Sequence, residues 1–133
     1  MTEETLLHRQ IHPSWIQNDV VASQAFIEEK SISSLSFTTP YKDENKLSVY
    51  NGDKFSAEDS YNHFVANFVS AGVLSVTIKE VHSIEQLTAY EDNDPFYGHS
   101  VIDYTRVSNS TQIKKKAKKI KNIAIQRGWT YKK

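Results

Sequence analysis

Residues 107–133 read VSNSTQIKKKAKKIKNIAIQRGWTYKK and contain the clearest structural pattern in the chain. The spacing of the apolar residues predicts a helix over Thr111–Arg127, which Gly128 is suited to end. A short strand is predicted after it, at Trp129–Tyr131. One side of the helix is apolar, so we expect that side to pack against the rest of the fold. It consists of Ile113, Ala117, Ile120 and Ala124.

Upstream of this helix, apolar and polar residues alternate along several short stretches, a pattern typical of strands with one buried face. The predicted strands are Thr5–His12, Leu47–Tyr50, Val73–Val81 and His99–Tyr104. Residues 28–46 are polar and rich in Ser and Thr, which indicates a long connection. Within it we expect one further strand, at Ile32–Phe37.

A second amphipathic helix is predicted between Ser56, a suitable N-cap, and Gly72, a suitable stop. We expect residues 1–133 to form a single compact α+β domain. Its mostly antiparallel sheet would be covered on one face by the two amphipathic helices, with a short C-terminal strand at its end. The apolar stripe of the second helix consists of Tyr61, Phe64, Val65 and Phe68.

Positive and negative charges are divided between two parts of the chain. The whole sequence holds sixteen Lys plus Arg and sixteen Asp plus Glu, so the formal net charge is zero. Residues 1–106 hold all sixteen acids and seven of the bases, whereas residues 107–133 hold nine bases and no acid. This division indicates an anionic partner for the basic end, or contact with the acidic remainder of the chain itself.

Lysines cover the side of the C-terminal helix opposite its apolar side. This pattern is compatible with a solvated surface, with contacts to the phosphate backbone of a nucleic acid, and with docking on an acidic protein. Sequence-specific DNA reading is disfavoured, because Arg, Asn or Gln usually contact the base edges, whereas this side of the helix carries mainly lysine. Membrane-surface binding is disfavoured, because the apolar side has no aromatic anchor. The predicted partner-binding lysines are Lys114, Lys115, Lys118 and Lys119.

The first predicted strand carries the candidate catalytic residues His8, Arg9 and His12. Pro13 favours an extended conformation here, in which the two histidines lie about 13 Å apart, so we expect no metal site. Arg9 falls on the apolar face, where a buried guanidinium needs a carboxylate or a phosphate. It either forms an internal ion pair or belongs to a site for a nucleotide or another phosphate-bearing substrate.

The sequence His8-Arg9, followed by the hydroxyl residues of Ser34–Thr39, loosely resembles the layout of ADP-ribosyl-transferring enzymes. These enzymes carry an Arg or His on an early strand of a small split sheet and hydroxyl residues on a later strand. The resemblance covers two short pieces, lacks the diagnostic glutamate motif, and identifies no family over the length of the chain. It implies a small enzyme that acts on a nucleotide.

The acidic loop Glu91–Gly98 contains Phe96 and Tyr97. These side chains either fold back on the domain or, if exposed, anchor a binding partner. The absence of Cys excludes disulfides and thiolate chemistry, and the four glycines form no phosphate-binding motif. We therefore expect no cofactor.

The first hypothesis is a small non-enzymatic accessory or regulatory protein that binds a macromolecular partner through its lysine-rich helix. The alternatives are a protein that binds a nucleic-acid backbone, and a small enzyme built on His8, Arg9 and His12. The two oppositely charged parts of the chain could also drive self-association. No segment is apolar enough to span a bilayer and no leader is recognisable, so we expect a cytoplasmic protein without a membrane partner, bacterial or from a phage.

Overall fold

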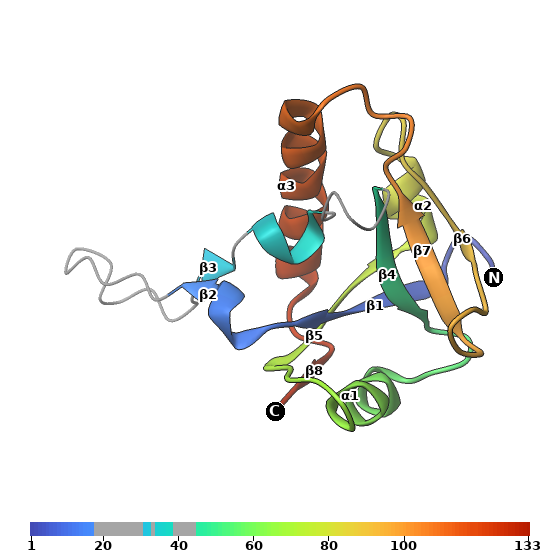
Figure 1. The fold of residues 1–133 in the computed structure, drawn as a ribbon, viewed down its shortest axis with the longest axis vertical. Coiled ribbons are helices and arrows are strands. Elements are labelled where there is room, and N and C mark those ends of the chain that lie inside the picture. The colour runs from blue at the N-terminus through green and yellow to red at the C-terminus, as the bar shows by residue number, and fades with distance from the viewer. Residues whose placement is uncertain (18–30, 33, 39–44) are drawn as a thin grey trace.

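The computed structural model describes residues 1–17, 31–32, 34–38 and 45–133. In these residues, one antiparallel sheet has the strand order β6-β7-β4-β1-β5-β8 (Figure 1). Its strands are β1 (Leu6–Ile11), β4 (Lys46–Asn51), β5 (Gly72–Thr77), β6 (Thr88–Glu91), β7 (His99–Asp103) and β8 (Tyr131–Lys132). The helices are α1 (Ala57–Val65), α2 (Ile78–His82) and α3 (Ser110–Arg127). This arrangement confirms the predicted compact α+β fold and its short C-terminal strand.

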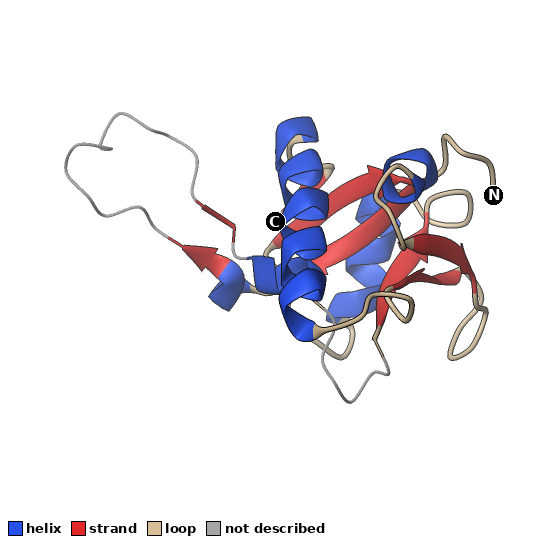
Figure 2. Cartoon of the chain, turned by 90° about the horizontal axis from the view of Figure 1, so that it is seen from above, coloured by secondary structure: helices blue, strands red, loops and turns tan. Residues whose placement is uncertain are grey.

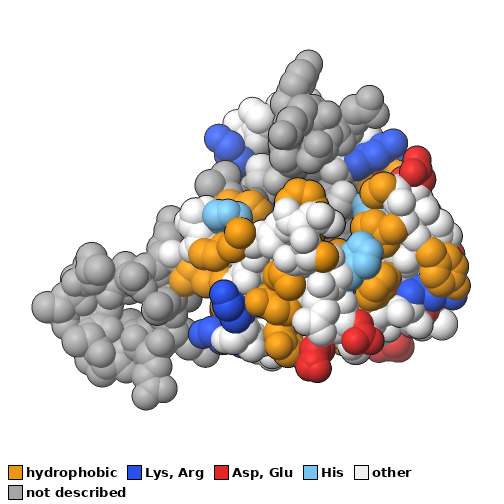
Figure 3. Space-filling model, turned by 60° about the horizontal axis from the view of Figure 1, so that its bottom comes forward, with side chains coloured by type: hydrophobic (Ala, Val, Ile, Leu, Met, Phe, Trp, Pro, Cys, Tyr) orange, Lys and Arg blue, Asp and Glu red, His pale blue; other side chains and the backbone are white. Residues whose placement is uncertain are grey.

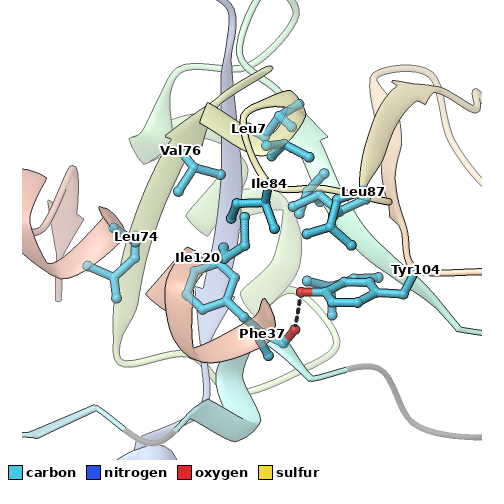
Figure 4. Packing of buried hydrophobic residues seen from close by; sticks show 14 of the residues in the cluster. Leu7, Phe37, Leu74, Val76, Ile84, Leu87, Tyr104 and Ile120 are labelled. Atoms are coloured by element: carbon cyan, nitrogen blue, oxygen red, sulfur yellow. Dashed lines mark hydrogen bonds between the residues drawn. The ribbon is translucent and has the colours of Figure 1, made fainter. Parts of the chain in front are cut away.

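The hydrophobic core lies between one face of the sheet and α3, which Figure 2 shows in front of the strands. Leu7 and Ile11 of β1 are fully buried in it, as the alternation in the sequence predicts. Figure 4 shows Leu74 and Ile120 in the same cluster. All four residues of the predicted apolar side of α3 are buried there: Ile113, Ala117, Ile120 and Ala124.

The helix α2 lies where the sequence predicts a continuing strand, so the prediction for Val73–Val81 is wrong beyond Thr77. Thr77 and Glu80 form a capping box. The Thr77 hydroxyl accepts a hydrogen bond from the Glu80 N–H (3.1 Å), and the Glu80 carboxylate accepts one from the Thr77 N–H (2.7 Å). These two bonds satisfy N–H groups at the start of α2 that have no partner within the helix. The helix buries Val81 in the core.

Two helices cover the core face of the sheet, but they are α2 and α3, whereas α1 lies on the opposite face. The strands β4 and β5 run parallel to each other with β1 between them, so the connection through α1 has to cross one face of the sheet. Gln10, which points away from the core, donates a hydrogen bond to the Ser60 hydroxyl of α1 (3.0 Å). Sequence periodicity predicts that α1 packs on the sheet but does not say on which side.

The helix α1 is shorter than the predicted one, although Ser56 caps it as expected. Tyr61 is buried and its ring lies 4.9 Å from that of Tyr131, but Phe68 lies beyond the helix and is 64% exposed. The face of the sheet under α1 is largely polar, so only part of the predicted apolar stripe is buried.

Part of the predicted connection over residues 28–46 is described. The two short strands β2 (Ile16–Gln17) and β3 (Ser31–Ile32) pair with each other. The strand predicted at Ile32–Phe37 is wrong from Ser34, because Ser34–Phe37 form the 3-10 helix η3. The Phe37 side chain is fully buried, and its carbonyl oxygen accepts a hydrogen bond from the Tyr104 hydroxyl at 2.7 Å (Figure 4). Residues 28–30, 33 and 39–44 of this connection lie outside the described residues.

Candidate functional site

A pocket of about 400 Å³ opens on the side of the sheet that carries α1. The strands β1 and β4 pair at Leu7 with Asn51 and at His8 with Tyr50, and then diverge (Figure 1). Side chains of α1, of the turn after it, and of the loop before β7 surround the resulting gap. Figure 3 brings this side of the molecule forward and shows hydrophobic and histidine side chains together on it.

The pocket brings together three of the candidate site residues predicted from the sequence, namely His8, Arg9 and Phe96. His12 and Tyr97, which the sequence also singles out, are not among the lining residues. The sheet contributes His8, Arg9, Gln10, Ser48, Val49, Tyr50 and His99, and the surrounding segments contribute His63, Phe64, Asn67, Phe68, Pro95 and Phe96.

His8 forms part of the pocket floor and is 3% exposed. Its Nε2 lies 3.1 Å from the carbonyl oxygen of Phe55 and therefore donates a hydrogen bond to it. Its Nδ1 lies 2.7 Å from the Ser75 hydroxyl. Burial lowers the pKa of His8, an effect that the hydrogen bond to Phe55 only partly opposes.

The lowered pKa of His8 predicts a loss of stability in mild acid. The unfolded chain takes up a proton near the usual histidine pKa of about 6.5, whereas the folded protein takes it up only at lower pH. The contribution of His8 to the free energy of unfolding is therefore complete above about pH 6.5. It falls as the pH drops towards the pKa of His8 in the folded protein, and below that pKa it no longer changes with pH. We expect His8→Gln to reduce the difference in melting temperature between about pH 7.5 and about pH 5. An unchanged difference in this variant would show that other groups cause the acid sensitivity.

Tyr50 and His63 meet at the edge of the pocket, where the Tyr50 hydroxyl lies 2.8 Å from His63 Nδ1. Burial raises the pKa of Tyr50 to about 12, so the phenol keeps its proton at neutral pH. The hydroxyl and Nδ1 share one hydrogen bond, which holds the imidazole ring in place. The other ring nitrogen, His63 Nε2, makes no hydrogen bond with the described residues.

Phe96 folds back on the domain and closes one side of the pocket. Its ring centroid lies 5.0 Å from that of Tyr50, 4.6 Å from that of His63 and 5.3 Å from that of His99. The loop is held by His99, whose Nδ1 donates to the Asp92 carbonyl oxygen at 2.7 Å. The neighbouring Tyr97 instead points outward and is 65% exposed. The predicted pair is therefore divided between the pocket wall and the surface.

Arg9 lies on the core side of β1, where the sequence places it, and spans the gap between β1 and its neighbours. Its Nε donates to the Ser36 carbonyl oxygen (2.8 Å) and its Nη1 to the Ser48 carbonyl oxygen (3.0 Å). Its guanidinium also lies 5.4 Å from the ring centroid of Trp15. These contacts connect η3 and β4 to β1 at the point where the two strands diverge.

His12 has a local structural role. It caps the 3-10 helix η1 (Pro13–Trp15) by accepting a hydrogen bond from the Ser14 N–H at 3.0 Å. The three candidate catalytic residues are thus not assembled in one site. Among the described residues, no group of three or more His, Asp or Glu side chains could hold a metal ion.

A second candidate surface, which we call the lysine face, consists of Lys114, Lys115, Lys118 and Lys119 on α3. All four side chains are exposed, as predicted. No carboxylate of the described residues forms an ion pair with any of them. Lys116, in contrast, is buried beside the apolar side of the helix. Since α3 covers the core face of the sheet, the lysine face and the pocket lie on opposite sides of the molecule.

Several pocket residues are not predicted from the sequence, among them Gln10, Ser48 and Asn67. One signal was present, because His8 and Gln10 alternate with the core residues of β1. A polar alternation usually indicates a solvated face, whereas here α1 and neighbouring segments bury it. The pocket is lined by segments that lie far apart in the chain, so no local sequence pattern predicts that they come together.

The chain matches no protein-family model, no curated protein and no solved structure. Across the part of the chain that the structure describes, none of the helices has both the length and the apolar character needed to cross a membrane.

Proposed function

We propose that this protein is a non-enzymatic accessory or regulatory protein that binds a negatively charged macromolecule through the lysine face. The supporting observation is that four exposed lysines lie side by side without an ion pair to any described carboxylate. The opposite side of α3 is fixed in the core, so the helix presents these charges on a rigid element. A concentrated positive potential attracts an anionic partner and accelerates association.

We favour an acidic protein as the partner. The helix α3 contains no aromatic residue that could stack on bases, and its one arginine, Arg127, pairs with Glu80 at 2.7 Å. A nucleic-acid backbone is the second candidate, because contacts to phosphate require only positive charge. In either case we place the protein in the cytoplasm of a bacterial cell, where both kinds of partner are present.

An enzymatic function is less well supported. That hypothesis needs His8, Arg9 and His12 to converge in one concave site. His8 and Arg9 do line one pocket, but each donates hydrogen bonds to backbone carbonyls, and His12 caps a separate turn. These interactions give the three side chains structural roles.

The electrostatic origin of binding predicts a strong dependence on salt. Immobilised protein is expected to retain its partner from a host lysate at about 50 mM salt and to release it by about 500 mM. Nuclease treatment of the lysate separates the partner classes, since it abolishes capture of a nucleic acid and leaves capture of an acidic protein unchanged. A partner retained equally at both salt concentrations would contradict binding through the lysine face.

A further inference from the structure

We propose that the pocket between β1, β4 and α1 is a binding site for an uncharged, planar aromatic group of a small molecule. Its volume, about 400 Å³, lies within the range of about 300–1,000 Å³ that is typical of small-molecule sites. The site is independent of the lysine face, because the two lie on opposite sides of the sheet.

Aromatic rings form much of the pocket wall. Phe64 and Phe68 stack on each other, with ring centroids 5.0 Å apart and an interplanar angle of 29°. Phe96 lines the pocket from the loop before β7, and its ring packs on Tyr50. Phe68 is 64% exposed, so its ring borders the opening with much of its surface in water. A planar ligand would bury this surface and gain the ring contacts that aromatic groups prefer.

The polar side chains of the floor already have hydrogen-bond partners within the protein. His8 contacts Ser75 and Phe55, and Gln10 bonds with Ser60 and Ser70. His99 contacts the Asp92 carbonyl oxygen and the Ser48 hydroxyl. A ligand is therefore not needed to satisfy these groups, and the floor acts as a closed surface against which a ring can lie.

The polarity of the lining favours an uncharged ligand with one polar substituent. No Asp, Glu or Lys is among the described lining residues, and Arg9 donates to backbone carbonyls. A cationic group would lose hydration here without gaining an opposite charge. An anionic group would meet Arg9 among the described lining residues, but the Arg9 Nε and Nη1 groups already donate to backbone carbonyl oxygens. His63 Nε2 and the Asn67 amide make no hydrogen bond with the described residues, so they are available to a hydroxyl or ring N–H of the ligand.

An NMR titration of the full chain with 2-naphthol tests this proposal. We expect saturable shifts of the amide signals of Tyr50, Phe68 and Phe96, and weaker binding of two probes built on the same bicyclic carbon framework. Decahydro-2-naphthol lacks the planar rings and 2-naphthoate carries a negative charge. Shifts spread over the whole surface, no saturable shifts, or equal affinity for all three probes would overturn the proposal.

Two neighbouring exposed residues provide matched variants. Phe68→Ala removes a pocket ring and is expected to raise the dissociation constant for 2-naphthol about tenfold. Val69→Ala removes apolar surface at a residue that is 58% exposed and lies outside the pocket lining, so the constant should not change. Equal effects of the two variants, or no effect of Phe68→Ala, would show that the ring does not bind at this site.

Discussion

Phe37→Ala is expected to lower the free energy of unfolding by about 3–5 kcal/mol. The Phe37 ring is 0% exposed and belongs to the same cluster as Ile120 and Tyr104 (Figure 4). Truncation removes the buried ring and leaves a cavity between η3, the sheet and α3. The hydrogen bond from Tyr104 is made to the backbone carbonyl of Phe37, so the substitution itself does not remove it. Urea denaturation measures the change.

Phe68→Ala is the matched control for this prediction, because it makes the same chemical change at a ring that is 64% exposed. Its expected effect on stability is within about 0.5 kcal/mol, as for most surface substitutions. A loss of less than about 1 kcal/mol for Phe37→Ala would mean that η3 is not part of the core, contrary to the observed packing.

The elements best predicted from the sequence are those whose pattern is local. The alternation of Leu7 and Ile11 with His8 and Gln10 predicts β1, and the spacing of Ile113 and Ile120 predicts α3. The helix α2 shows the limit, because an alternating pattern continues past Thr77 while a capping box starts a helix there. Thr77 and Glu80 carry that signal in the sequence, and at this position it outweighs the alternation.

The pocket could be predicted only in part. His8 and Arg9 indicate a site near β1, but the hollow exists because β1 and β4 diverge after the pair of His8 with Tyr50. That divergence depends on strand pairing across the sheet, and the wall depends on which face α1 crosses. Neither property is encoded by the periodicity of one segment. The exposure of the lysine face, in contrast, follows from the helical spacing of α3 alone.

Reversing the charge of the lysine face is expected to weaken partner binding about 100-fold or more. Replacing Lys114, Lys115, Lys118 and Lys119 by Glu turns attraction into repulsion for any anionic partner. These side chains are exposed, so the fold should be retained, which circular dichroism can verify. A matched control variant makes the same change in net charge at exposed lysines elsewhere: Lys54, Lys79, Lys132 and Lys133.

The most direct measurement is capture of partners from a host lysate with the wild type, the lysine-face variant and the control variant side by side. The predicted result is a partner that binds the wild type and the control variant but not the lysine-face variant. If all three proteins capture the same partner equally, the lysine face is a solvated surface and does not bind it.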